Sequence, residues 1–285
     1  MLIQWYPGHI AKAERQLKEQ LKRVDVVLEV LDARIPFTSH HPQVEDWIND
    51  KPKILVVNRV DMIPADLKQA WQEWFQLEEE EVYFTNAQKG KGIKQIIKAA
   101  QNAGKQMNQR RRDRGMRPRP VRAVVIGFPN VGKSALINRL VGRKAVASAR
   151  RAGVTKQLHW VRISDQIEML DAPGVIPWRL EDQEDAIKLA ICDDIGEASY
   201  DNQRVAVAFV ELLQELDFAD ALQSRYQLEA DEFSGEEYLD KLAQLNYKGD
   251  QERAACQLLN DFRKGLLGAI PLDLPPTSKL SEMRF

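Results

Sequence analysis

One short segment carries the strongest chemical signal in the chain. Residues 127–134 read Gly-Phe-Pro-Asn-Val-Gly-Lys-Ser, which matches the pattern GxxxxGK[ST] between an apolar run and a helical stretch. Glycines let backbone amides in such a loop turn toward phosphate oxygens, and the following helix start adds a favourable dipole. Lys133 would neutralise the β- and γ-phosphates, and Ser134 would ligate Mg²⁺. The residues expected to touch a nucleotide in this segment are Asn130, Val131, Gly132, Lys133, Ser134 and Ala135.

Residues farther along the chain predict the rest of a phosphate and metal site. Asp171 and Gly174 form a DxxG motif after the apolar run at 167–170. Such a carboxylate can hold Mg²⁺ through water, and the Gly174 amide can bond the γ-phosphate. Thr155 lies between the two motifs, where it either closes over Mg²⁺ and the γ-phosphate or fills a Gly-containing turn. The expected magnesium ligands are Ser134, Thr155 and Asp171.

Two earlier segments carry the residue types that recognise guanine. Asn58, Arg59 and Asp61 follow one apolar run, and Asn86 and Ala87 follow the next. A carboxylate at Asp61 can accept both the N1–H and the 2-amino protons of guanine, which adenine does not offer. Asn58 would hold the loop and touch the base edge, and a backbone amide at 86–87 would bond guanine O6. This disfavours ATP and predicts GTP and GDP as ligands, although NxxD at a strand end also occurs as a simple Asx turn.

The apolar pattern predicts the elements that must position these residues. Strands are expected at 24–31, 53–57, 82–85, 121–127, 158–163 and 167–170, and helices around 9–22, 65–77, 91–104 and 132–141. Continuous Val/Ile runs between helices indicate an α/β fold with a mostly parallel sheet covered on both faces. Such sheets bind ligands beyond the carboxyl ends of their strands, and each motif follows a predicted strand.

Residues 1–178 and 179–285 are expected to form two domains. The strand signal disappears after about residue 181, and apolar stripes at 203–217 and 252–266 indicate a small all-α domain. Residues 179–285 hold 23 acidic and 11 basic side chains, whereas residues 1–178 hold 30 basic and 19 acidic ones. The first part is therefore the better candidate for binding a polyanion.

Composition excludes several other classes of protein. The chain of 285 residues is 44% hydrophobic and 29% charged, which is typical of a soluble globular protein. Its longest apolar runs are strand-sized, and the N-terminus lacks the pattern of a secretory signal. Cys192 and Cys256 form no CxxC pair, which excludes a four-thiolate zinc site. We expect a cytoplasmic protein with no membrane contact.

A strongly basic segment joins the two sets of strands. Residues 105–122 contain eight basic side chains and one acidic side chain. The segment is expected to be either a solvated linker or a contact for nucleic-acid phosphates, and its arginine content favours the second alternative.

The motifs together resemble the G domain of small GTPases in an unusual order. Here NRVD at 58–61 and TNA at 85–87 precede the phosphate loop and DAPG, as in circularly permuted GTPases. The sequences WYPGHIAKA near the N-terminus, LDARIP at 31–36 and DFRKGLLG at 261–268 make the chain similar to the ribosome biogenesis GTPase A family. The resemblance implies a circularly permuted P-loop GTPase domain, with residues 105–122 as the joining linker, followed by a small all-α domain.

The resemblance also implies partners and further site residues. It implies a monomer that hydrolyses GTP and assists late assembly of the large ribosomal subunit, in contact with a subunit precursor, rRNA and ribosomal proteins. It assigns the catalytic water to His9, although a histidine beside a Pro-Gly turn also commonly starts a helix, and it places a K⁺ at Asn130. The chain departs from the family motif NKxD at Arg59, a change that leaves guanine selection to Asp61.

Two residues after the DxxG motif bear on the rate of hydrolysis. Val175 and Ile176 cannot hydrogen-bond a water, so the enzyme should be slow without a partner. With the role that the resemblance implies for His9, the expected catalytic set is His9, Lys133 and Thr155. Two alternatives stay open: a nucleotide-gated RNA-binding scaffold with negligible turnover, and a GTPase that acts on tRNA or in translation.

Overall fold

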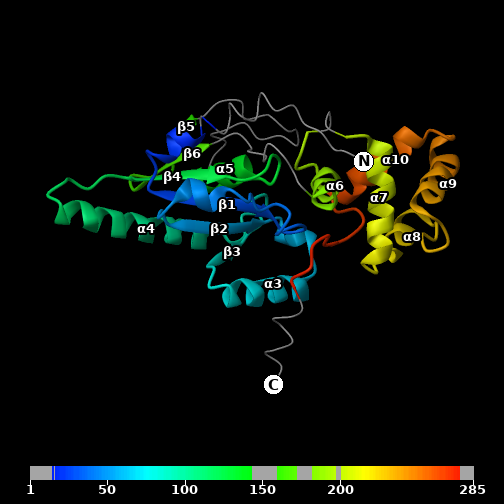
Figure 1. Cartoon of the computed structure of the whole chain (residues 1–285), viewed down its shortest axis with the longest axis horizontal. Coiled ribbons are helices and arrows are strands. Elements are labelled where there is room, and N and C mark those ends of the chain that lie inside the picture. The colour runs from blue at the N-terminus through cyan, green and yellow to red at the C-terminus, as the bar shows by residue number, and fades with distance from the viewer. Residues whose placement is uncertain (1–14, 16, 143–158, 172–181, 197–199, 277–285) are drawn as a thin grey trace, which may run out of the picture.

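The computed structural model describes residues 15, 17–142, 159–171, 182–196 and 200–276. Six strands of this part form one sheet in the order β3-β2-β1-β4-β6-β5 (Figure 1). All neighbouring strands are parallel except β5, which runs antiparallel to β6. The strands are β1 (Val26–Asp32), β2 (Lys53–Asn58), β3 (Val82–Phe84), β4 (Val121–Ile126), β5 (His159–Arg162) and β6 (Ile167–Asp171). The predicted mostly parallel sheet is confirmed, and each predicted strand is present within a few residues.

Alternate side chains of β1 show that both faces of the sheet are covered. Val26, Leu28 and Val30 belong to the core beneath α4 (Ile93–Asp113) and α5 (Lys133–Val141). Val27 packs with helical residues 17–21 and α2 (Val44–Ile48), whereas Leu31 packs with α3 (Ala65–Leu77). Successive side chains of a strand point to opposite faces of the sheet, so the apolar residues of β1 pack into apolar layers on both faces. The Val- and Leu-rich sequence of the strand predicts this arrangement.

The basic segment differs from its prediction. Residues 105–113 are not linker but the last part of α4, which runs unbroken for 21 residues. Arg and Gln are good helix formers, and Pro118 is the first proline in the segment, so nothing at 105–113 interrupts the helix. Only residues 114–120 connect α4 to β4. The short helix α2 was not predicted.

The described residues after 182 form helices and no strand. These are α6 (Gln183–Cys192), α7 (Asn202–Glu215), α8 (Asp220–Tyr226), α9 (Gly235–Tyr247) and α10 (Gln251–Arg263). Polar side chains cap several starts: Ser234 and Glu237 form a capping box at α9, and Asp250 caps α10. The predicted apolar stripes at 203–217 and 252–266 are largely buried faces of α7 and α10, but the prediction is wrong for Leu266, which lies beyond the end of α10 and is 52% exposed. Among the described residues no helix has the length and apolarity needed to cross a membrane.

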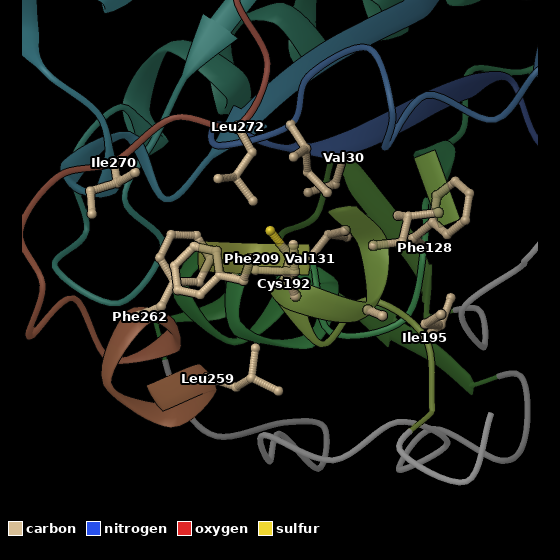
Figure 2. Packing of buried hydrophobic residues seen from close by; sticks show 14 of the residues in the cluster. Val30, Phe128, Val131, Cys192, Ile195, Phe209, Leu259, Phe262, Ile270 and Leu272 are labelled. Atoms are coloured by element: carbon tan, nitrogen blue, oxygen red, sulfur yellow. The ribbon is translucent and has the colours of Figure 1, made fainter. Parts of the chain in front are cut away.

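The helical part shares a hydrophobic core with the sheet. Figure 2 shows Cys192 with Val30 and Val131 on one side and Phe209 and Phe262 on the other, and all five belong to one buried cluster. The predicted division at residue 178 falls outside the described residues and stays a prediction.

The last described segment, after α10, is non-helical. Its backbone returns to the sheet, where the Leu272 and Asp273 amides both donate to the Arg34 carbonyl oxygen at 2.8 and 3.0 Å. The chain therefore crosses from the helical part back to the end of β1.

Candidate nucleotide-binding site

The predicted site residues that the structure describes lie at or beyond the carboxyl ends of the strands, at one edge of the sheet. Asp32 ends β1 opposite Asn58, which ends β2, and Asp171 ends β6 opposite Val125 of β4. The loop at 127–132 leaves β4 at the same edge. Because parallel strands end together, residues more than 100 positions apart in the chain lie at the same edge of the sheet.

The loop between β4 and α5 has a backbone that requires glycine at two positions. Gly127 and Gly132 have φ values of 143° and 105°. A Cβ on Gly127 would lie 2.4 Å from the Val30 carbonyl oxygen, and one on Gly132 would lie 2.1 Å from Nδ2 of Asn58. The two glycines thus allow the loop to pass close to β1 and to the base-recognition segment.

Lys133 folds back into this loop. Its Nζ donates to the carbonyl oxygens of Gly127 and Phe128 at 3.1 and 2.6 Å, and the residue is 6% exposed. The loop therefore surrounds an ammonium group at the start of α5, the position where phosphate oxygens are expected. Ser134 follows directly on the first turn of the same helix.

Asn58 joins the phosphate loop to both base-recognition segments. Its Nδ2 donates to the Val131 carbonyl oxygen at 2.8 Å. Its Oδ1 accepts from the Thr85 hydroxyl at 3.1 Å and from the Ala87 amide at 3.0 Å. The side chain is buried, so these bonds fix the three segments relative to one another. Both backbone amides at 86–87, one of which is predicted to bond guanine O6, thus have partners within the chain, because the Asn86 amide donates to the Lys91 carbonyl oxygen at 3.2 Å.

The other base-recognition residues differ in exposure. The Asp61 carboxylate is partly exposed, and its Oδ2 lies 3.1 Å from Nζ of Lys89. Asn86 is buried and accepts the Lys89 amide at 2.8 Å through Oδ1. Arg139 of α5 donates Nε to the Ala87 carbonyl oxygen at 3.1 Å and bonds the Gln88 carbonyl oxygen as well. Sequence reasoning missed Arg139, which ties this loop to the helix that follows the phosphate loop.

Arg59, the departure from the family motif, has two partners inside the site. Its Nη1 lies 2.7 Å from Oδ2 of Asp32, and its Nη2 donates to the Asn130 carbonyl oxygen at 2.6 Å. Asp32 also pairs with the buried Arg34, Nη2 to Oδ2 at 2.8 Å. Burial raises the pKa of Asp32, but Arg34 and Arg59 outweigh it and hold this pKa at about 2. The carboxylate therefore stays charged and anchors both arginines.

The phosphate loop also contacts the helical part. Nδ2 of Asn130 donates to the Asp193 carbonyl oxygen at 2.6 Å and to its Oδ2 at 3.1 Å, at the end of α6. Nη2 of Arg34 donates to the Cys192 carbonyl oxygen at 3.3 Å. Sequence reasoning missed Asp193 and the roles of Asp32 and Arg34, although the two opposite charges inside the apolar run VLDARIP at 30–36 signal a buried pair.

Several predicted residues are not placed. His9, Thr155 and Gly174 lie outside the described residues, and only the backbone of Asp171 is described. Within the described ranges no three His, Cys, Asp or Glu side chains form a group able to hold a metal. The predicted magnesium ligands, which include a serine and a threonine, therefore stay a prediction.

Comparison with known proteins decides the family. The family model described as a 50S ribosome-binding GTPase matches residues 122–226. The ribosome biogenesis GTPase A of Bacillus licheniformis is 37% identical over 229 residues, which are 80% of this chain and 81% of that protein. The chain belongs to the ribosome biogenesis GTPase A family. The Bacillus cereus member of the family is 34% identical over 281 residues and covers 96% of this chain and 95% of its own length.

Solved structures agree with membership in the ribosome biogenesis GTPase A family. A crystal structure of GNP-bound YlqF from T. maritima has a TM-score of 0.63 and 25% sequence identity, with coverage of 93% of this chain and 98% of that chain. A GDP-bound structure of the same protein has a TM-score of 0.64. The match to the GTPase family model begins at β4 and leaves out β1–β3, as a permuted order of motifs requires. The predicted family and fold class are confirmed.

Proposed function

We propose that this chain binds and hydrolyses GTP and assists late assembly of the large ribosomal subunit. The observation that carries the proposal is the Asn58 side chain, which joins the phosphate loop at Val131 to the base loop at Thr85 and Ala87. One buried amide thus couples the segment that would hold the phosphates to the segment that would hold the base. The family names supply the ribosomal context.

Guanine would be selected by Asp61. A carboxylate can accept two hydrogen bonds from guanine, through N1–H and the 2-amino group, whereas adenine offers no matching pair of donors and leaves the carboxylate unpaired when the base covers it. In the structure the Oδ2 atom of Asp61 lies 3.1 Å from Nζ of Lys89, a contact that a bound guanine base would have to replace or share. We expect Asp61→Asn to lower the preference for GTP over ATP at least tenfold in competition binding, because the amide repels N1–H through its own donor. An unchanged preference would contradict the role of Asp61.

The oxygen donors near Lys133 fit magnesium. Ser134 lies at the start of α5, and Asp171 ends β6 next to β4, the strand that leads into the phosphate loop. Hydroxyl and carboxylate oxygens suit this hard cation. Ser134 and Thr155 would hold it directly and Asp171 through water, and the bound ion would neutralise charge on the β- and γ-phosphates. Gly174 would offer its amide to the γ-phosphate, and Asn130 would supply an oxygen to K⁺.

Hydrolysis is proposed to be slow until the ribosome completes the site. Val175 and Ile176 cannot orient a water, so His9 would hold or activate the water instead. The same pair of apolar residues favours the second candidate, a nucleotide-gated RNA-binding scaffold with negligible turnover. A role in translation or on tRNA is the third, and ribosome profiles after depletion separate it by showing or lacking stalled subunit precursors.

The deciding experiment measures GTP hydrolysis by the purified protein with and without large ribosomal subunits in K⁺ buffer. We expect a slow basal rate that subunits raise manyfold, a loss of tight nucleotide binding in Lys133→Ala, and a lower stimulated rate with normal GTP affinity in His9→Ala. GTP binding without any stimulation would favour the scaffold. Equal stimulated rates for His9→Ala and the unchanged protein would contradict a catalytic His9.

A further inference from the structure

The outer face of α4 is a long polar surface on which the one acidic side chain is Asp113, the last residue of the helix. From residue 93 to residue 112 the helix contains no Asp or Glu. Side chains at helical spacing form an exposed row, here called the α4 basic face: Lys94, Lys98, Asn102, Lys105, Gln109 and Arg112. At the rise of an α-helix this row is about 27 Å long.

The apolar residues of α4 lie on the opposite face of the helix. Ile93, Ile96, Ala100 and Gly104 are buried against the sheet, where a Cβ on Gly104 would lie 3.1 Å from Val121. Because these residues are already covered, the basic face cannot be the polar half of a helix that inserts its apolar half into a membrane. Its charges face outward.

The segment after α4 adds arginines in a defined backbone. Asn108 and Arg119 bond reciprocally: Nδ2 of Asn108 donates to the Arg119 carbonyl oxygen at 2.9 Å, and Oδ1 accepts the Arg119 amide at 3.0 Å. Nε of Arg111 donates to the Arg117 carbonyl oxygen at 3.0 Å. These contacts fold residues 114–119 back against the helix end.

Most of the charge at this end is not neutralised. Arg119 pairs with Asp25 at 2.7 Å. Within the described part of the chain no carboxylate forms an ion pair with the other arginines of the segment, which are Arg110, Arg111, Arg112, Arg114 and Arg117. Their charges are thus available to an external polyanion.

We propose that the α4 basic face and residues 110–117 bind the phosphate backbone of double-helical RNA. A linear row of lysines and arginines matches repeated phosphates, and the exposed Asn102 can bond a ribose hydroxyl. Apart from Met116, this surface exposes no large apolar side chain in the described structure, so it lacks the aromatic platforms that stack single-stranded bases. This proposal rests on the proposed ribosomal function and names where RNA would bind.

The position of the surface separates it from the helical part. In Figure 1 the end of α4 and the segment after it reach one extremity of the molecule, and α9 and α10 lie at the other. RNA bound along α4 would therefore leave the acidic helices free for a different contact.

The test compares two variants with the same loss of charge. Lys98→Gln/Lys105→Gln/Arg112→Gln neutralises the α4 basic face with good helix formers. Lys241→Gln/Lys248→Gln/Lys264→Gln removes three exposed charges from the helical part. Fluorescence anisotropy measures binding of each protein to a 20-base-pair RNA duplex over a salt series, with the matching DNA duplex, single-stranded RNA and polyglutamate as competitors.

We expect the α4 variant to bind duplex RNA about tenfold or more weakly than the unchanged protein. The slope of log affinity against log salt concentration should become less steep by about two to three. The helical-part variant should change affinity less than threefold, and both should keep normal GTP affinity. Equal RNA affinities of the two variants would overturn the proposal, as would better competition by single strands or polyglutamate. Duplex DNA bound as tightly as duplex RNA would overturn the assignment to RNA.

The outcome is distinguishable from that of the proposed function. If subunits stimulate hydrolysis equally in both variants and the variants bind RNA equally, the α4 proposal fails and the assembly GTPase stands. If the α4 variant alone loses duplex RNA while subunits stimulate neither variant nor the unchanged protein, the RNA surface stands and the ribosomal function fails.

Discussion

Single buried side chains hold the candidate site together, and Asn58 has the most partners that bear on the nucleotide. We expect Asn58→Ala to lower the free energy of unfolding by about 2–4 kcal/mol, because the Val131 carbonyl, the Thr85 hydroxyl and the Ala87 amide all lose a buried partner. GTP affinity should fall at least tenfold. Urea unfolding and nucleotide titration measure both quantities. Thr85→Val is the matched control, since it removes one of the three bonds and should lose less than half as much stability.

His40 gives a prediction about pH. Burial lowers its pKa, but the hydrogen bond and charge of Glu29, with Nδ1 to Oε1 at 2.9 Å, raise the pKa above its ordinary value. A pKa that is higher in the folded state than in the unfolded state adds to the free energy of unfolding. This contribution is fully present below pH 6.5 and is lost as the pH rises through the pKa of the folded state. We therefore expect His40→Gln to cost more stability at pH 6 than at pH 9, by less than about 1 kcal/mol since His40 is a third exposed. Equal costs at the two pH values in urea titrations would contradict this linkage.

At the scale of elements, the turn from β4 into α5 is held in a shape that glycine alone allows. We expect Gly132→Ala to cost about 2–4 kcal/mol and to reduce GTP affinity at least tenfold, because its Cβ would overlap Asn58 Nδ2 and its φ of 105° is strained. Gly142, at the other end of α5, has a φ of 74° and open space around it.

Gly142→Ala is therefore the matched control for the turn. It should cost about 1 kcal/mol from backbone strain and leave GTP affinity unchanged. Similar losses of GTP affinity in both variants, measured by titration, would show that the contact with Asn58 does not decide the shape of the phosphate loop.

At the scale of the whole molecule, the C-terminal segment ties the helical part to the sheet. The Asp273 carboxylate is buried and accepts the Thr38 amide at 3.0 Å, and its Oδ1 lies 2.9 Å from Nζ of Lys188 on α6. We expect Asp273→Ala to cost about 3 kcal/mol, because it leaves a half-buried ammonium unpaired. Leu274→Ala, at a half-exposed position next to it, should change stability by less than about 0.5 kcal/mol. Equal urea midpoints for the two variants would remove this role from Asp273.

The sequence alone determined the sheet, the phosphate loop and the base-recognition motifs. Val/Ile runs and the pattern GxxxxGK[ST] are local, because a strand's apolar period and a glycine-rich turn depend on neighbours in the chain. The order of motifs likewise predicted a permuted GTPase, which the fold and the family confirm. A local pattern failed at 105–113, where a basic composition suggested a linker and helix propensity continued α4.

The tertiary structure alone decided which charged side chains meet. Asp32, Arg59 and Asn130 come from three separate strand ends, and Asp193 comes from the helical part. Their spacing along the chain carries no signal of contact, since long-range pairs form only when the sheet and α6 bring the ends of these elements together. The contact of Asn130 with Asp193, which joins the phosphate loop to the helical part, therefore could not be predicted from residue types and spacing.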